Sequence, residues 1–161
     1  VRYTERRWLV LLFTDLTAST HLSRLLEVEL YDEILEAVRT IWRDVARRHD
    51  GVVIRMQGDG AVIAFGMVRP TEFDGLKATL AALDIHDRVE RVVMPDMSLR
   101  SHASAHSGID AGIVLLAHAG DERGWKDLAG EVPNTAGKLE KLAASGEILA
   151  SRRALGPHIA R

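Results

Sequence analysis

One stretch decides the fold of this chain: Leu12–Thr20, which reads Leu-Phe-Thr-Asp-Leu-Thr-Ala-Ser-Thr. It closes a continuous run of apolar residues that begins at Trp8 and ends at Thr14, and such a run predicts a short strand buried on both faces. The run leads directly into Asp15 and a series of hydroxyl side chains, which are typical of the beginning of a helix. We therefore expect a buried strand, a polar turn that carries Asp15, and then a helix.

Downstream of this turn, the pattern predicts a helix followed by a hairpin. Apolar residues recur at helical spacing over Leu30–Val45, which indicates an amphipathic helix. Two short strand-like runs, Val52–Arg55 and Ala61–Phe65, flank the sequence Gln-Gly-Asp-Gly at 57–60. This arrangement predicts a β-hairpin whose turn carries Asp59.

The second half of the chain adds elements of the same two kinds. A helix is expected over Glu72–Val89, with four large apolar side chains on one face: Phe73, Leu76, Leu80 and Leu83. The elements expected after it are strands at Leu99–Ser107 and Ile113–Ala117 around a glycine-containing turn at 108–112, a polar arm at 120–130, a helix at Pro133–Ala144 and a strand at Glu147–Ala150. This order predicts an α+β fold with an antiparallel or mixed sheet and helices on one face.

Composition narrows the class of protein. The chain has 161 residues, 47% of them hydrophobic and 27% charged, which predicts one compact domain over residues 1–161. Its net charge of −2 argues against a nucleic-acid or membrane-surface partner. It has no cysteine, so disulfides, thiolate metal sites and cysteine nucleophiles are excluded. No apolar run approaches the roughly 18 residues of a membrane span, and no signal peptide is recognisable, so we expect a cytoplasmic location.

Two carboxylates stand at positions that suit chemistry. Asp15 follows a buried strand and Asp59 lies at a hairpin tip, so both can converge at one sheet edge. Paired carboxylates beside free backbone N–H groups form a site for Mg²⁺ and phosphate. The alternative is structural: Asp15 caps a helix and Asp59 makes a turn. Geometry alone leaves both interpretations open.

Several segments occur in an order that is similar to a known family. They are Leu12–Thr20, Arg55–Gly66 with its Gly-Asp pair, His106–Gly112 with its His-Ser-Gly turn, the series Asp127, Asn134 and Lys138, and the closing strand Gly146–Ser151. Together they resemble the catalytic domain of class III adenylyl and guanylyl cyclases. The resemblance runs from about Leu11 to Ser151, and ordered matches of this number are far more specific than any one motif.

This resemblance implies a fold and a metal-dependent reaction. The fold would be a ferredoxin-like α+β core with an added hairpin arm. Many members continue into a last hairpin, and this sequence stops short of it at Arg161, which suggests a truncation, a disordered tail or a minimal variant. The reaction would convert a nucleoside triphosphate to a 3′,5′-cyclic nucleotide and pyrophosphate. Asp15 and Asp59, with the carbonyl of Leu16, would hold two Mg²⁺ or Mn²⁺ ions. Backbone N–H groups of the turn, through Thr17, Ala18, Ser19 and Thr20, would contact the phosphates.

The resemblance also assigns the remaining site residues and a homodimer. Asn134 would orient the ribose and Lys138 would offset charge at the α-phosphate, while Arg55 and Asp127 would contact the base edge. In the family, the metal aspartates come from one protomer and the other site residues from its partner, so a homodimer has two shared sites. Lys138 stands where the family usually has Arg, and Arg55 where it usually has Lys.

The substrate and even the activity have alternatives. Asp127 with Arg55 favours ATP, but the same pair suits the edge of cytosine or uracil, as in pyrimidine cyclases of bacterial antiphage signalling. A second class of function is a nucleotide-binding regulatory module derived from a cyclase, for which Lys138 is the sequence support. His102 and His106 share one face of a predicted strand. Without a third ligand nearby, we expect them to be ordinary half-buried histidines.

Overall fold

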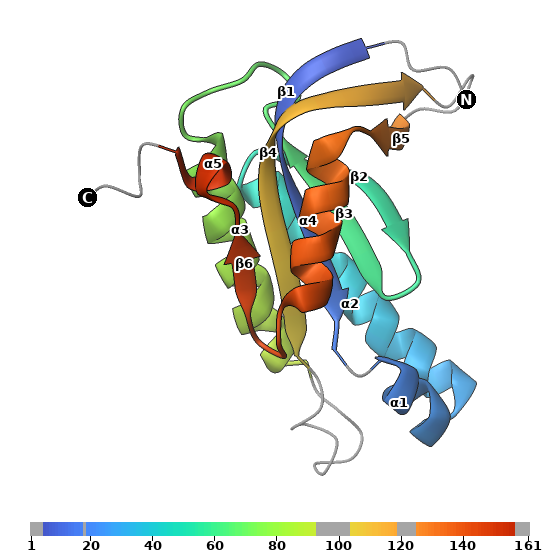
Figure 1. Ribbon diagram of the computed structural model, residues 1–161. Coiled ribbons are helices and arrows are strands. Elements are labelled where there is room, and N and C mark those ends of the chain that lie inside the picture. The colour runs from blue at the N-terminus through green and yellow to red at the C-terminus, as the bar shows by residue number, and fades with distance from the viewer. Residues whose placement is uncertain (1–4, 18, 93–103, 119–124, 157–161) are drawn as a thin grey trace.

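The computed structural model describes residues 5–17, 19–92, 104–118 and 125–156 and shows helices packed on a single sheet (Figure 1). The strands are β1 (Glu5–Leu16), β2 (Gly51–Gln57), β3 (Gly60–Phe65), β4 (Ala105–His118), β5 (Trp125–Ala129) and β6 (Ile148–Ala150). The helices are α1 (Ser19–Leu25), α2 (Val28–Arg48), α3 (Asp74–Glu90), α4 (Glu131–Leu142) and α5 (Arg152–Leu155). The expected strand at the start of the chain, the hairpin and the three longer helices are all present.

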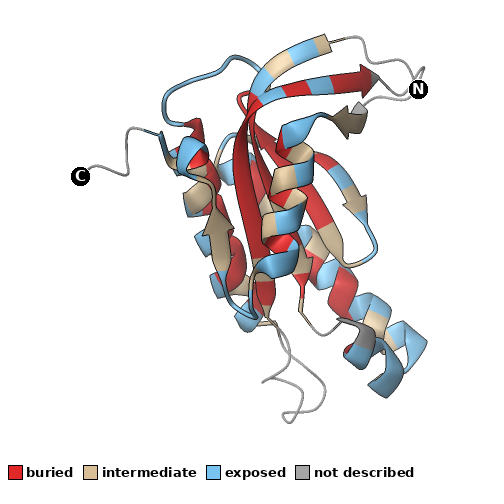
Figure 2. Ribbon diagram, viewed as in Figure 1, coloured by how far each residue is buried: buried red, intermediate tan, exposed pale blue. Residues whose placement is uncertain are grey.

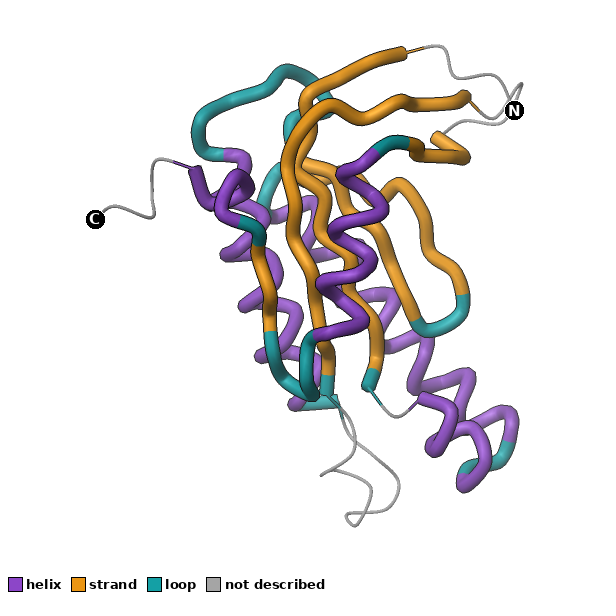
Figure 3. Tube along the Cα trace, viewed as in Figure 1, coloured by secondary structure: helices purple, strands orange, loops and turns teal. Residues whose placement is uncertain are grey.

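The sheet has the order β2-β3-β1-β4-β5, and β6 adds to β4 in parallel (Figure 3). The other pairings are antiparallel, so the sheet is mixed, as predicted. β1 lies between β3 and β4 and pairs with both along its length. Its register places Asp15 opposite Gly60 on one side and His106 on the other. Because β1 is a central strand, its C-terminal end lies between its two neighbouring strands and next to the β2–β3 turn.

Helices cover both faces of the sheet, which corrects the expectation that they lie on one face. The larger core cluster joins α2 and α3 to residues of β1 such as Val10 and Leu12. The smaller cluster lies on the opposite face, where Val132 and Ala136 of α4 pack against Leu9 and Leu11. Figure 2 shows the central strands mostly in red, the colour of buried residues. Because successive residues of a strand point to opposite faces, a continuous apolar run such as β1 needs a cover on both sides.

β4 is one strand where two strands and a turn were expected. Gly108 and Gly112, which suggested the turn, lie inside it, because β4 pairs with β1 without a break from Ala105 to Leu116. Gly108 serves close packing: a Cβ atom there would lie 2.3 Å from the carbonyl oxygen of Ala136 in α4. The start of the predicted strand, 99–103, lies outside the described residues. The predicted hairpin arm corresponds to β5, which pairs antiparallel with the end of β4.

The large apolar side chains assigned to one face of the second helix are exposed. They are Phe73, just before α3, and Leu76, Leu80 and Leu83 within it. The buried face consists mainly of small residues, including Gly75, Ala78, Ala81 and Ala82, with Ile85 and Val89. Small side chains allow the helix axis to approach the sheet closely, and at Gly75 an added Cβ would collide with the carbonyl oxygen of Ala154 in α5. Within the described ranges, no helix has the length and apolar character needed to cross a bilayer.

Candidate active site

Asp15 and Asp59 meet at the edge of the sheet. The backbone N–H of Leu16 lies 3.0 Å from the carbonyl oxygen of Asp59 and 2.8 Å from Oδ1 of Asp15. The β1–β3 register places Gly60, the residue after Asp59, opposite Asp15. The strand end and the hairpin turn are thus joined by backbone contacts, which bring the two carboxylates together.

The position of Asp15 makes its carboxylate costly to ionise. Burial, followed by the negative charges of Asp59 and Glu140, raises the pKa of Asp15 to about 7. Burial is also the largest cause that raises the pKa of Glu140. Carboxylates crowded in this way favour a bound proton or a cation among them. A donor set of carboxylate oxygens is what Mg²⁺ and Mn²⁺ prefer, so these residues fit the divalent ions that the sequence predicted.

A third carboxylate and an imidazole complete this group, and sequence analysis assigned a metal role to neither. Ligand atoms of Asp15, His106 and Glu140 all lie within 4.8 Å of one another. Nδ1 of His106 lies 2.8 Å from the carbonyl oxygen of Glu140 and 3.1 Å from its Oε1. One signal was available: Glu140 follows Val132 and Ala136 at helical spacing, so it is an acid on the buried face of α4. His102, the other histidine considered, lies outside the described residues.

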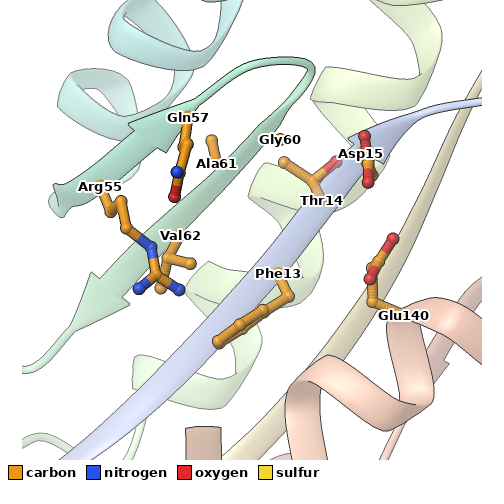
Figure 4. Close-up of a pocket in the computed structure, with 9 residues that line it drawn as sticks. All are labelled: Phe13, Thr14, Asp15, Arg55, Gln57, Gly60, Ala61, Val62 and Glu140. Atoms are coloured by element: carbon orange, nitrogen blue, oxygen red, sulfur yellow. The ribbon is translucent and has the colours of Figure 1, made fainter. Parts of the chain in front are cut away.

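A pocket of about 200 Å³ opens beside Asp15 on the face of the sheet covered by α4 (Figure 4). β1 supplies Phe13 and Asp15, β2 supplies Arg55, and α4 supplies Glu140. The full lining is Phe13, Thr14, Asp15, Arg55, Gln57, Gly60, Ala61, Val62 and Glu140. Apolar walls, a cation at one end and acids at the other suit a ligand with a ring and a metal-bound anionic group.

The other predicted site residues lie outside this pocket. Asn134 and Lys138 are exposed on α4, two positions on either side of the buried Ala136 and therefore on the far side of the helix. Asp127 lies on β5, half-buried, where its Oδ1 accepts a hydrogen bond from the N–H of Leu128 at 2.9 Å. Within this protomer, Arg55 lines the same pocket as Asp15, which differs from the expectation that the base-contacting residues come from the partner protomer; Asp127, Asn134 and Lys138 do not line it.

Some of the backbone N–H groups that were predicted to contact phosphate already donate hydrogen bonds within the protein. The N–H of Leu16 is engaged with Asp59 and Asp15, and the N–H of Thr17 donates to the carbonyl oxygen of Ser104 at 2.6 Å. The hydroxyl of Thr17 is buried without a hydrogen-bond partner among the described residues. Ala18 lies outside the described residues. The backbones of Ser19 and Thr20 form the first turn of α1, where N–H groups have no acceptor within the helix.

Comparison with known proteins places this chain in a family. The model of the adenylate and guanylate cyclase catalytic domain matches residues 2–156. The chain belongs to this family. It is a domain of the class III nucleotide cyclase family.

The curated relatives of this cyclase domain are longer and uncharacterized. A protein of Rhizobium meliloti (strain 1021) is 27% identical over 157 residues, which are 94% of this chain and 15% of that protein. A protein of Mycobacterium tuberculosis (strain ATCC 25618 / H37Rv) is 31% identical over 154 residues, 94% of this chain and 27% of its own length. The cyclase domain therefore spans less than a third of the length of these relatives.

Solved cyclase structures share the fold. The guanylyl cyclase Cya2 superposes with a TM-score of 0.77 at 24% identity, covering 96% of this chain and 79% of Cya2. The adenylyl cyclase CyaB of P. aeruginosa has a TM-score of 0.80 at 20% identity, with 94% and 80% covered. The dimeric guanylyl cyclase domain of RhoGC from the aquatic fungus Blastocladiella emersonii has a TM-score of 0.82 at 19% identity, with 94% and 84% covered. The similarity confirms the predicted fold class and leaves the choice of nucleotide open.

Proposed function

We propose that this cyclase domain, over residues 1–161, converts a nucleoside triphosphate, with ATP favoured, to the 3′,5′-cyclic nucleotide and pyrophosphate. The observation that carries the proposal is the contact between the end of β1 and the β2–β3 turn, beside which Asp15 lies near Asp59 and lines a pocket that also contains Arg55. The acids in this pocket, Asp15 and Glu140, suit the metal-bound triphosphate, and the arginine at its other end suits the base.

Asp15 and Asp59, with the carbonyl of Leu16, would hold two Mg²⁺ or Mn²⁺ ions. The crowding that raises the pKa of Asp15 is the reason these groups fit a cation. When bound, the ions lower the pKa of the ribose 3′-hydroxyl and offset the charge of the triphosphate. In the reaction, the 3′-oxygen would form a bond to the α-phosphorus, the bond from that phosphorus to pyrophosphate would break, and the hydroxyl proton would pass to solvent water.

The side chains of α4 would act on the ribose and the α-phosphate. Asn134 can hold the ribose through its amide, and the ammonium of Lys138 can offset charge that develops at the α-phosphate. Both point away from the sheet that holds Asp15, whereas Glu140 of the same helix points toward it. We therefore propose that each site is completed by Asn134 and Lys138 of a second copy of this chain. In a two-fold homodimer, this reciprocal sharing of residues gives two equivalent sites.

Arg55 and Asp127 would select the base. A carboxylate accepts a hydrogen bond from the adenine amino group while the guanidinium donates to a ring nitrogen, which favours ATP. Cytosine and uracil present edges that the same pair can bind, so CTP and UTP are the alternative substrates, as in antiphage pyrimidine cyclases. Replacing Asp127 with Ala removes one charge-assisted hydrogen bond, and we expect the preference among nucleotides to fall by about one to two powers of ten.

One assay tests the activity and the substrate together. The protein is incubated with Mn²⁺ and each of the four ribonucleoside triphosphates, and the products are separated and identified by mass. We expect cyclic AMP with release of pyrophosphate. A cyclic pyrimidine product would replace ATP as the substrate, and nucleotide binding without any cyclic product would favour the regulatory module. An unchanged substrate ranking in Asp127→Ala would show that the base is selected elsewhere.

A further inference from the structure

Glu140 is a buried acid that lies beside Asp15 but was not among the expected metal ligands. Its side chain is 9% exposed, and its Oε1 is buried without a hydrogen-bond partner among the described residues. In Figure 4 its carboxylate points from α4 toward Asp15. A buried carboxylate oxygen without a well-aligned hydrogen-bond donor costs free energy, so this geometry favours a cation between Glu140 and Asp15.

Backbone packing holds Glu140 in this place. β4 carries Gly108 where α4 crosses it, and a Cβ atom at this position would lie 2.3 Å from the backbone nitrogen of Glu140. The missing side chain lets α4 approach the sheet, which brings Glu140 next to the cross-strand pair Asp15 and His106. Three separate elements therefore converge on one point, with ligand atoms of all three residues within 4.8 Å of one another.

The hydrogen bond of His106 ties its ring to the backbone of Glu140. A carbonyl oxygen only accepts, so Nδ1 of His106 must donate its hydrogen to the carbonyl oxygen of Glu140, 2.8 Å away. Nδ1, the ring nitrogen that lies next to Glu140, therefore carries a hydrogen and is not itself a metal ligand. The same bond keeps the Nδ1 hydrogen from fully satisfying Oε1 of Glu140.

We propose that Glu140 is a further ligand of the divalent cation that Asp15 binds, and that His106 positions Glu140 for this role. The inference rests on the proposed function, because it concerns one of the ions assigned to the reaction. Carboxylate oxygens are ligands that both Mn²⁺ and Mg²⁺ accept. Bound by carboxylates from two elements of the fold, Mn²⁺ should associate with the protein in the absence of nucleotide.

Mn²⁺ titration of matched variants tests this assignment. Binding is followed by the loss of the electron paramagnetic resonance signal of free Mn²⁺, without nucleotide and at fixed pH. We expect Glu140→Gln to raise the Kd on the order of tenfold or more, and Glu131→Gln to leave it unchanged. The Glu131→Gln control removes the same negative charge at an exposed position of the same helix. A wild-type protein that does not bind Mn²⁺ alone, or a Glu140→Gln variant with wild-type affinity, would overturn the inference.

Thermal melting separates metal binding from a purely structural pairing of Glu140 with His106. Gln has nearly the same size as Glu, and it removes one of two facing negative charges. We expect Glu140→Gln to melt without metal at least as high as wild type, and to gain less than wild type when Mn²⁺ is added. A lower melting temperature with a full gain from Mn²⁺ would assign Glu140 to structure alone.

Product formation distinguishes failure of this inference from failure of the proposed function. Asp15→Asn should abolish both Mn²⁺ binding and cyclic nucleotide formation. If Asp15→Asn does so while Glu140→Gln keeps its Mn²⁺ affinity, the proposed function stands and Glu140 is not a ligand. If wild type forms no cyclic product but Glu140→Gln still weakens Mn²⁺ binding, the metal site stands without the cyclase activity.

Discussion

At the scale of single residues, charge decides most of what the site can do. Asp15 and Asp59 share a sheet edge with a third acid, Glu140, and this crowding together with burial raises the pKa of Asp15 to about 7. A proton or a cation among the three acids relieves the repulsion. We propose that a metal ion does so, in place of the helix cap and the turn that the sequence also allowed.

Replacing either metal aspartate should remove activity and leave the fold intact. We expect Asp15→Asn and Asp59→Asn each to lower cyclic nucleotide formation on the order of 10²-fold or more, because one metal ligand is lost. Asp50→Asn is the matched control: Asp50 is exposed, contacts Lys77, and has a φ of 59°, which Asn tolerates. Product yield and circular dichroism measure the two effects. Full activity in either site variant would contradict the metal assignment.

Lys138 should contribute charge to the transition state. We expect Lys138→Ala to lower kcat on the order of 10²-fold, because a donor at the α-phosphate is removed. Lys138→Arg should keep or raise kcat without changing the preferred base, since the guanidinium can donate two parallel hydrogen bonds. Lys141→Ala, at another exposed lysine of α4, should behave as wild type. Steady-state kinetics with each triphosphate decide this, and an unchanged kcat in Lys138→Ala would remove the residue from the mechanism.

At the scale of elements, the approach of α4 to β4 sets the geometry of the site. Gly108→Ala should destabilise the protein by about 1–3 kcal/mol or more, because the new methyl group would meet the backbone of α4. Gly137→Ala, inside α4, should instead stabilise the protein by about 0.5–1 kcal/mol, because alanine favours the helix more than glycine does. The new Cβ has room, since it would make an ordinary contact at 3.6 Å with the ring of Phe13. Urea unfolding measures both. Equal effects of the two substitutions would mean that α4 and β4 are not in such close contact.

α5 is held to β4 by a buried acid. Arg153 donates to both oxygens of Asp110 at 2.9 and 2.6 Å, and Ser151 donates to Oδ1. Burial alone would raise the pKa of Asp110, but these hydrogen bonds outweigh it and lower the pKa. An acid with a lowered pKa contributes stability above the pKa of the unfolded chain, and that stability is lost as the pH falls through the folded value.

This pairing predicts a pH-dependent effect of removing Arg153. Arg153→Ala should cost about 1–2 kcal/mol at pH 7, because it leaves the fully buried carboxylate of Asp110 without its cation. The cost should shrink below about pH 4, where the carboxyl group of the variant becomes protonated. Arg152→Ala, at the exposed neighbouring position, should cost little at either pH. Urea unfolding at pH 7 and pH 3 measures these free energies, and a cost independent of pH would contradict the ion pair.

At the scale of the whole molecule, Asn134 lies on the side of α4 that faces away from the sheet edge with Asp15 and Asp59. This separation predicts that each active site combines residues of two protomers. Asp59→Ala and Asn134→Ala should each be inactive alone, because every site in either homodimer lacks one residue. When the two are mixed, one site of the heterodimer should carry neither substitution. We expect part of the activity to return, up to about a quarter of wild type for random pairing. Cyclic nucleotide formation measures recovery, and no recovery despite demonstrated subunit exchange would place the whole site within one chain.

Local pattern was enough for much of the fold. The apolar run into Asp15 predicted β1, the Gly-Asp-Gly turn predicted the β2–β3 hairpin, and apolar spacing predicted α2. Pattern was not enough at glycines, which occur both in turns and where two elements pack closely. Gly108 and Gly112 suggested a turn, but only the packing of α4 on β4 showed that they permit close approach within a continuous strand. The closing helix α5 is too short to leave a periodic signal.

The sequence by itself determined which side chains share a face and which acids follow a strand or a turn, since both depend only on local spacing. It thereby determined the family, the fold class and the pair Asp15 and Asp59. Only the tertiary structure decided which faces are covered. It showed that the large apolar residues of α3 are exposed, and that Glu140 reaches Asp15 and His106. These contacts join residues far apart in the chain, and spacing along the sequence carries no information about the distance between such residues.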